Sequence, residues 1–103
     1  MKVIGVTACT AGIAHTYIVA EKIQKAAEEA GHKCKIETQG TIGIQNALTD
    51  QDIAEADVVI FAHDIAIRGT ERFKDKKVVD IPISVAMKNP KSLIATIEKK
   101  LGK

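Results

Sequence analysis

The hydrophobic pattern of the chain switches repeatedly between the period of strands and that of helices. Continuous apolar runs over 2–8 and 57–62 predict two buried strands. A clean alternation of side chains predicts a third strand over 33–38, and a short apolar run closed by proline predicts a fourth over 77–81.

Between these strands the apolar positions recur at helical spacing. An amphipathic helix is expected from about 14 to 30, and Gly31 follows it as a left-handed cap. The segment 49–52 reads Thr-Asp-Gln-Asp, a capping box that predicts a short helix over 50–56. A last helix is expected over 90–101, because it begins with proline and has one apolar face.

Strands that alternate with helices favour parallel pairing through right-handed crossovers. We therefore expect an α/β fold with a small four-stranded parallel sheet in the order 2-1-3-4, flanked by helices, and with 41–48 as a loop. Ligands of such sheets bind at the carboxyl ends of the strands, near the switch point. These ends carry Cys9, Gln39, His63 and Asp64, so the last three are possible rim residues of a site around Cys9.

Composition restricts the class of protein. The 103 residues are expected to form a single domain, 1–103, with an aliphatic core, since 46% are hydrophobic and only 3% aromatic. Few aromatic residues and a net charge of +2 argue against nucleic acid as a partner. Two cysteines without CxxC spacing predict no metal site and a reducing compartment. Without a long apolar stretch or a signal peptide, the sequence predicts a cytoplasmic protein that does not span a membrane.

Cys9 lies where the first strand ends and a loop of small residues leads into a helix. The backbone N–H groups of such a turn converge, and the helix dipole adds positive charge, which suits an anion and favours a thiolate. A buried structural cysteine is the alternative interpretation. The pattern favours Cys9 as a catalytic nucleophile within a phosphate-binding loop. The loop residues are Thr10, Ala11, Gly12, Ile13, Ala14, His15 and Thr16.

The spacing Cys9-x5-His15-Thr16 resembles the phosphate loop of the protein tyrosine phosphatases, which have arginine where this chain has His15. In those enzymes the arginine clamps the phosphate through two parallel hydrogen bonds, so its loss should weaken hydrolysis. A loop that forms phosphocysteine but hydrolyses it poorly suits a phosphate carrier. An enzyme like the low-molecular-weight phosphatases or arsenate reductases is the alternative, and a non-catalytic binding module is a third possibility.

Several segments resemble the fructose-type enzyme IIB (the B component) of the bacterial phosphoenolpyruvate-dependent sugar phosphotransferase system. They are Val6–Thr16, Glu37–Gly40, Ile42–Ile44, Ala56–Ile60 and Arg72-Phe73. The similarity extends over nearly the whole chain. It implies that a phosphohistidine of the A component passes its phosphoryl group to Cys9. The phosphocysteine then passes the group to fructose or a fructose-like sugar, which the membrane C component presents. No cofactor is implied.

The resemblance has one departure in the loop. The family usually has Cys-Pro-Thr-Gly, whereas this chain has Cys9-Thr10-Ala11-Gly12. Because a phosphate cradle of this kind is mainly backbone, we expect phosphate binding to persist and the transfer rate or the partner choice to change. His15 is expected to donate a hydrogen bond to the phosphate or to lower the pKa of Cys9; capping of the helix is the alternative.

Three further residues carry chemistry but are assigned lesser roles. Cys34 falls within the second strand and is expected to be a packed small hydrophobe rather than a second nucleophile. Arg68 and Arg72 follow the third strand and are expected at the surface; the alternative is that they reach the site or a partner.

Overall fold

A computed structural model describes residues 2–8, 13–40 and 43–100, with the backbone alone at 13–16. Five strands form one sheet in the order β3-β2-β1-β4-β5. The strands are β1 (Lys2–Ala8), β2 (Lys33–Gly40), β3 (Gly43–Gln45), β4 (Val58–His63) and β5 (Val78–Ile81). The helices are α1 (Ile13–Glu29), α2 (Asp50–Glu55), α3 (Ile83–Lys88) and α4 (Pro90–Lys100), with a short 3-10 helix, η1 (Thr70–Phe73).

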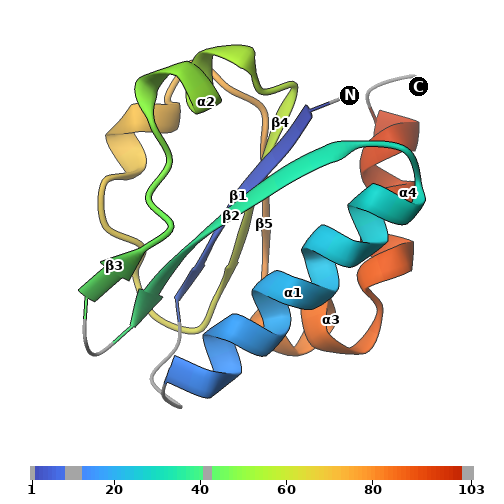
Figure 1. Ribbon diagram of the computed structural model, residues 1–103, viewed down its shortest axis with the longest axis horizontal. Coiled ribbons are helices and arrows are strands. Elements are labelled where there is room, and N and C mark those ends of the chain that lie inside the picture. The colour runs from blue at the N-terminus through green and yellow to red at the C-terminus, as the bar shows by residue number, and fades with distance from the viewer. Residues whose placement is uncertain (1, 9–12, 41–42, 101–103) are drawn as a thin grey trace.

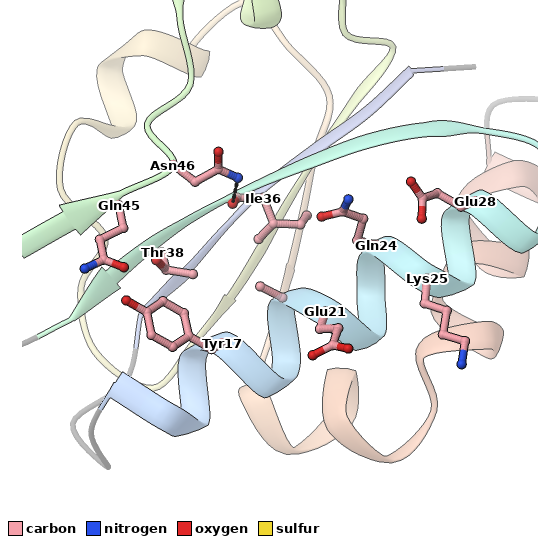
Figure 2. A pocket seen from close by; sticks show the side chains of 10 residues that line it. Tyr17, Glu21, Gln24, Lys25, Glu28, Ile36, Thr38, Gln45 and Asn46 are labelled. Carbon is pink, nitrogen blue, oxygen red and sulfur yellow. Dashed lines mark hydrogen bonds between the residues drawn. The ribbon is translucent and has the colours of Figure 1, made fainter.

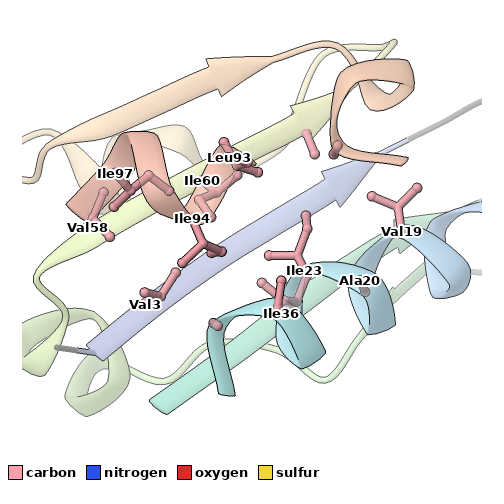
Figure 3. Close-up of a cluster of buried hydrophobic side chains, with 14 of the residues drawn as sticks. Val3, Val19, Ala20, Ile23, Ile36, Val58, Ile60, Leu93, Ile94 and Ile97 are labelled. Carbon is pink, nitrogen blue, oxygen red and sulfur yellow. The ribbon is translucent and has the colours of Figure 1, made fainter. Parts of the chain in front are cut away.

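The helices cover both faces of the sheet (Figure 1). On one face α1, α3 and α4 pack against the strands through a large aliphatic cluster, shown in Figure 3. On the other face α2 and η1 cover a smaller cluster that contains both phenylalanines of the chain, Phe61 and Phe73. Successive residues of β1 and β4 contribute to opposite clusters, which explains why these strands are continuous apolar runs.

The predicted sheet is confirmed in its parallel part and corrected at one edge. Strands β2, β1, β4 and β5 are the four that the sequence predicts, in the predicted order and all parallel. The expected loop 41–48, however, contains β3, which pairs antiparallel with β2 through Gln39 and Ile44. The sheet is therefore mixed and five-stranded. A strand of three residues is held by backbone pairing and leaves too short a side-chain pattern to be recognised.

The structure confirms two helix ends that were predicted from capping residues, the start of α2 and the end of α1. Thr49 caps α2, and its hydroxyl accepts a hydrogen bond from the Asp52 N–H while the Asp52 carboxylate accepts one from the Thr49 N–H. Gly31 has a φ of 87° just beyond α1, as expected for a left-handed cap. The segment 65–75 contains only η1, which begins after Gly69 at a φ of 73°.

Gly5 lets the three central strands approach one another closely. A Cβ at this position would lie 2.9 Å from Cδ1 of Ile36 on β2 and 2.9 Å from the carbonyl oxygen of Ile60 on β4. The backbone oxygen has no freedom to move away without disturbing the sheet.

We predict that Gly5→Ala lowers the free energy of unfolding by about 1–3 kcal/mol, the usual cost of overpacking a core, as measured by urea denaturation. Adding Ile36→Val removes the clash with Cδ1 but not that with the Ile60 oxygen. The double variant should therefore lose less than the sum of the two single changes. A Gly5→Ala protein as stable as the wild type would refute this account of the close approach.

Candidate active site at the carboxyl end of β1

The carboxyl end of β1 lies between two polar residues that were predicted from the sequence to lie at this edge. Ala8, the last residue of β1, pairs with Gln39 of β2 on one side and with His63 of β4 on the other. The Asp64 N–H donates to the Ala8 carbonyl at 3.0 Å. The predicted rim residues Gln39, His63 and Asp64 therefore do flank the end of β1.

The structure describes only part of the predicted phosphate loop, which extends from Cys9 to Thr16. Cys9, Thr10, Ala11 and Gly12 lie outside the described residues, and of the loop segment 13–16 the backbone forms the first turn of α1. The chain thus passes from the end of a central strand to the start of a 17-residue helix within four residues. A helix that starts so close to a strand end brings the positive end of its dipole to the same edge of the sheet.

The side chain of Glu37, beside this rim on β2, is completely buried as an ion. Its Oε1 accepts hydrogen bonds from the Leu48 N–H and from Nη1 of Arg72, both at 3.0 Å. Its Oε2 accepts from Nη2 of Arg72 at 3.0 Å and from Nε2 of Gln39 at 2.9 Å. Burial raises the pKa of Glu37, but these four hydrogen bonds outweigh it, so the pKa lies below its ordinary value.

Arg72 corrects one prediction, because its side chain is not a free surface group. It forms a bidentate ion pair with Glu37, and its Nε donates to the Gly69 carbonyl at 2.8 Å. Only 27% of the Arg72 side chain is exposed. Sequence reasoning missed this pair because Glu37 shares its face of β2 with Lys33 and Lys35, as a solvent-facing residue would.

Gln39 holds the segment after β4 through a pair of hydrogen bonds. Its side-chain oxygen accepts from the Arg68 N–H at 2.8 Å, and its Nε2 donates to the Arg68 carbonyl at 2.9 Å. Gln39 is only 2% exposed, so this amide replaces its lost hydration with bonds to backbone and to Glu37. Arg68 itself lies at the surface, as predicted.

His63 is held by acceptors at both ring nitrogens. Nδ1 lies 2.6 Å from the Ile65 carbonyl oxygen and Nε2 lies 2.8 Å from Oδ1 of Asp80. Both partners are hydrogen-bond acceptors, so this geometry favours the form of the ring that carries a proton on each nitrogen. Burial lowers the pKa of His63, but the bond to Ile65 and the Asp80 and Asp64 carboxylates outweigh it and raise the pKa. The ring therefore ties β5 to the end of β4.

Cys34 lies at the opposite end of the sheet and packs against the aliphatic cluster, as predicted. It pairs with Val3, five residues before Ala8, so about 16 Å of strand separates it from the residue that precedes Cys9. Burial raises the pKa of the Cys34 thiol to about 12. At neutral pH this thiol is protonated and a poor nucleophile.

The comparisons with known proteins agree with one another. A family model described as "PTS system, Lactose/Cellobiose specific IIB subunit" matches residues 4–96. A curated relative from Escherichia coli K12, named "PTS system fructose-like EIIB component 2", is 46% identical over 101 residues, which is 98% of this chain and 95% of that protein. The chain belongs to the IIB family of the phosphotransferase system.

Solved structures support the assignment of this IIB chain. An enzyme IIB subunit from Escherichia coli K12 superposes with a TM-score of 0.93 at 44% identity, over 98% of this chain and 94% of that one. A domain of the fructose-specific IIABC component from Borrelia burgdorferi has a TM-score of 0.86 at 45% identity, over 91% and 89% of the two chains. The IIB chain therefore has a role in the phosphoryl relay of a sugar phosphotransferase system.

A groove of about 700 Å³ lies beside the site rather than in it (Figure 2). It runs between α1 and the β2–β3 edge, and its lining contains carboxylates, one amine, one aromatic ring and several side-chain amides. The charged and aromatic residues that line it are Tyr17, Glu21, Lys25 and Glu28. Mixed charge of this kind does not favour a phosphate. Within the ranges that the structure describes, no three His, Cys, Asp or Glu residues are placed to hold a metal ion.

We predict that Arg72→Met destabilises the IIB chain by about 3 kcal/mol in urea denaturation, because it leaves the buried carboxylate of Glu37 without its charged partner. The double variant Glu37→Gln with Arg72→Met removes the charge as well and should be more stable than Arg72→Met alone. As a control, Lys91→Met breaks an exposed pair with Glu29 and should change stability little.

The same pair predicts a pH dependence. Because the pKa of Glu37 is lowered in the folded chain, its ionisation stabilises the fold above the unfolded pKa of about 4.3. This contribution is lost as the pH falls through the folded pKa, so the advantage of wild type over Glu37→Gln should shrink below about pH 4. An advantage that is constant from pH 7 to pH 3 would contradict the assignment.

Proposed function

We propose that this chain, acting as one fructose-type IIB domain over residues 1–103, carries a phosphoryl group on Cys9. It accepts the group from a phosphohistidine of the A component and passes it to fructose or a fructose-like sugar bound by the membrane C component. The observation that supports this most is the placement of Ala8, the residue before Cys9, between Gln39 and His63 at the carboxyl end of the central strand. A ligand of a parallel sheet binds at such an edge.

The proposed chemistry has two steps. In the first, the Cys9 thiolate attacks phosphorus, the S–P bond forms and the P–N bond to the donor histidine breaks, and the histidine nitrogen keeps the electron pair. In the second, a sugar hydroxyl oxygen attacks the same phosphorus, loses its proton to a base, and the Cys9 thiolate leaves. The donor supplies the energy of both steps, so neither needs a cofactor.

The residues after Cys9 are proposed to bind the phosphoryl oxygens. The backbone N–H groups of 10–16 would donate to them, supported by the start of α1 at Ile13. His15 would add a hydrogen bond to the phosphate or favour the thiolate. Gln39, His63 and Asp64 would form the rim without touching the reacting atoms, since the first two already bind the segment after β4 and β5.

The position of Cys34 argues against the alternative of an arsenate-reductase-like enzyme. Such an enzyme resolves its reactive cysteine with a second thiol, but Cys34 lies at the other end of the sheet with a raised pKa. In addition, His15 replaces the arginine on which phosphatases of this loop type rely.

We predict that the protein gains one phosphoryl group when it is incubated with phosphoenolpyruvate, the general phosphotransferase components and a fructose-type A component, as measured by intact mass. Cys9→Ser should abolish the gain, because the serine hydroxyl is not ionised at neutral pH and is a much weaker nucleophile than a cysteine thiolate. Cys34→Ser is the matched control and should keep it. A gain that survives Cys9→Ser, or no gain with an A component shown to be active, would contradict the proposal.

A further inference from the structure

Residues 64–68, which we name the strap, cross the carboxyl end of β1. At one end the Asp64 N–H donates to the Ala8 carbonyl, next to β4. At the other end the backbone of Arg68 is bound on both sides by the amide of Gln39, which belongs to β2. Since β1 lies between β4 and β2, the strap covers two inter-strand spacings, about 10 Å. Figure 1 shows the chain leaving β4 and passing the ends of β1 and β2.

Further hydrogen bonds hold the end of the strap at Arg68. Besides the Gln39 amide, Nη2 of Arg72 lies 3.4 Å from the Arg68 carbonyl, and Nε of Arg72 donates to the Gly69 carbonyl. Arg72 is in turn anchored by the buried carboxylate of Glu37. This network therefore fixes where the Arg68 backbone lies relative to the end of β1.

The two arginines of the chain are used in different ways. Both terminal nitrogens of the Arg72 guanidinium bind Glu37, so the buried carboxylate neutralises its charge. The side chain of Arg68 is exposed, and its guanidinium forms no hydrogen bond or ion pair with the residues that the structure describes. Arg68 is thus the arginine whose charge remains available at this edge of the sheet.

The phosphate loop itself lacks such a charge. Between Cys9 and Thr16 the one side chain that can become cationic is His15, in the place where phosphatases of this loop type have arginine. A transferring phosphoryl group carries negative charge on its three equatorial oxygens, and a guanidinium can bind two of them at once. A site without an arginine in its loop gains this stabilisation if one is supplied from a neighbouring segment.

We propose that Arg68 is a phosphate-binding residue, held by the strap so that its guanidinium reaches the phosphoryl group at the end of β1. The inference rests on the proposed function, because it takes Cys9 as the acceptor. Arg68 forms and breaks no covalent bond; it donates N–H groups to the phosphoryl oxygens while phosphorus moves from the donor nitrogen to sulfur. The occupant is the phosphoryl group itself and not an acidic surface of the partner.

The test compares Arg68→Gln, Arg68→Lys and the control Lys74→Gln, which removes an exposed charge beyond η1. Each protein is mixed with phosphorylated A component over a range of concentrations, and the rate of phosphoryl gain on Cys9 is followed by intact mass. Arg68→Gln should lower the maximal rate roughly tenfold to a hundredfold. Arg68→Lys should recover part of it, because lysine keeps the charge but not the bidentate geometry. Lys74→Gln should match the wild type.

Thermal unfolding of the same proteins separates binding from folding. Arg68→Gln should keep the wild-type midpoint, because glutamine preserves the backbone bonds to Gln39. A maximal rate equal to that of Lys74→Gln overturns the inference. So does a loss confined to the half-saturating concentration of the A component, which would indicate recognition of the partner surface. A loss with a lowered midpoint and no rescue by lysine assigns Arg68 to the fold and also overturns it.

The wild-type protein in the same experiment reports on the proposed function separately. If it gains a phosphoryl group and Arg68→Gln behaves as the control does, only the role of Arg68 is wrong. If the wild type gains none from an active A component, the carrier function is contradicted and the role of Arg68 falls with it.

Discussion

The arrangement at the carboxyl end of the sheet depends on one buried charge, the carboxylate of Glu37. Four donors bind its two oxygens, and they come from three parts of the chain: β2 itself, the segment after β3, and η1. A carboxylate without these partners would be too costly to bury. The buried carboxylate therefore positions the segment after β3 and η1 relative to β2.

The course of the segment after β4 follows from this network. Arg72 forms an ion pair with Glu37, and its guanidinium also donates hydrogen bonds to the carbonyls of Arg68 and Gly69. The Gln39 side chain binds the Arg68 backbone as well. At the other side of β1, His63 links β4 to β5 through Asp80. The apolar clusters stabilise the sheet, while these polar contacts decide what surrounds the end of its central strand.

The sequence predicted the parts that local or periodic signals control. The order of the four parallel strands follows from alternating periods, the start of α2 from the capping box of Thr49, and the convergence of Gln39, His63 and Asp64 from parallel topology alone. The resemblance to the fructose-type IIB proteins rests on the segments around Cys9 and Glu37, since composition and period would fit many α/β domains.

What the sequence did not predict depends on contacts between distant residues. The pair of Glu37 and Arg72 joins positions 35 residues apart, and alternation along β2 describes Glu37 as solvent-facing. The edge strand β3 is defined by pairing with β2 over three residues, including a glycine at a φ of 114° that resembles a turn signal. Neither feature has a periodic signature, because each is defined by contacts in the folded chain.

We propose that the phosphoryl group is carried at the carboxyl end of β1, between β2 and β4. The most direct measurement is a comparison of backbone amide NMR spectra of the protein before and after phosphorylation by the A component. Among the described residues, we expect the largest shifts at Ala8, Gln39, Asp64 and Arg68 and no change at Cys34, which lies at the opposite end of the sheet. Shifts centred on the groove between α1 and β3, or on Cys34, would contradict it.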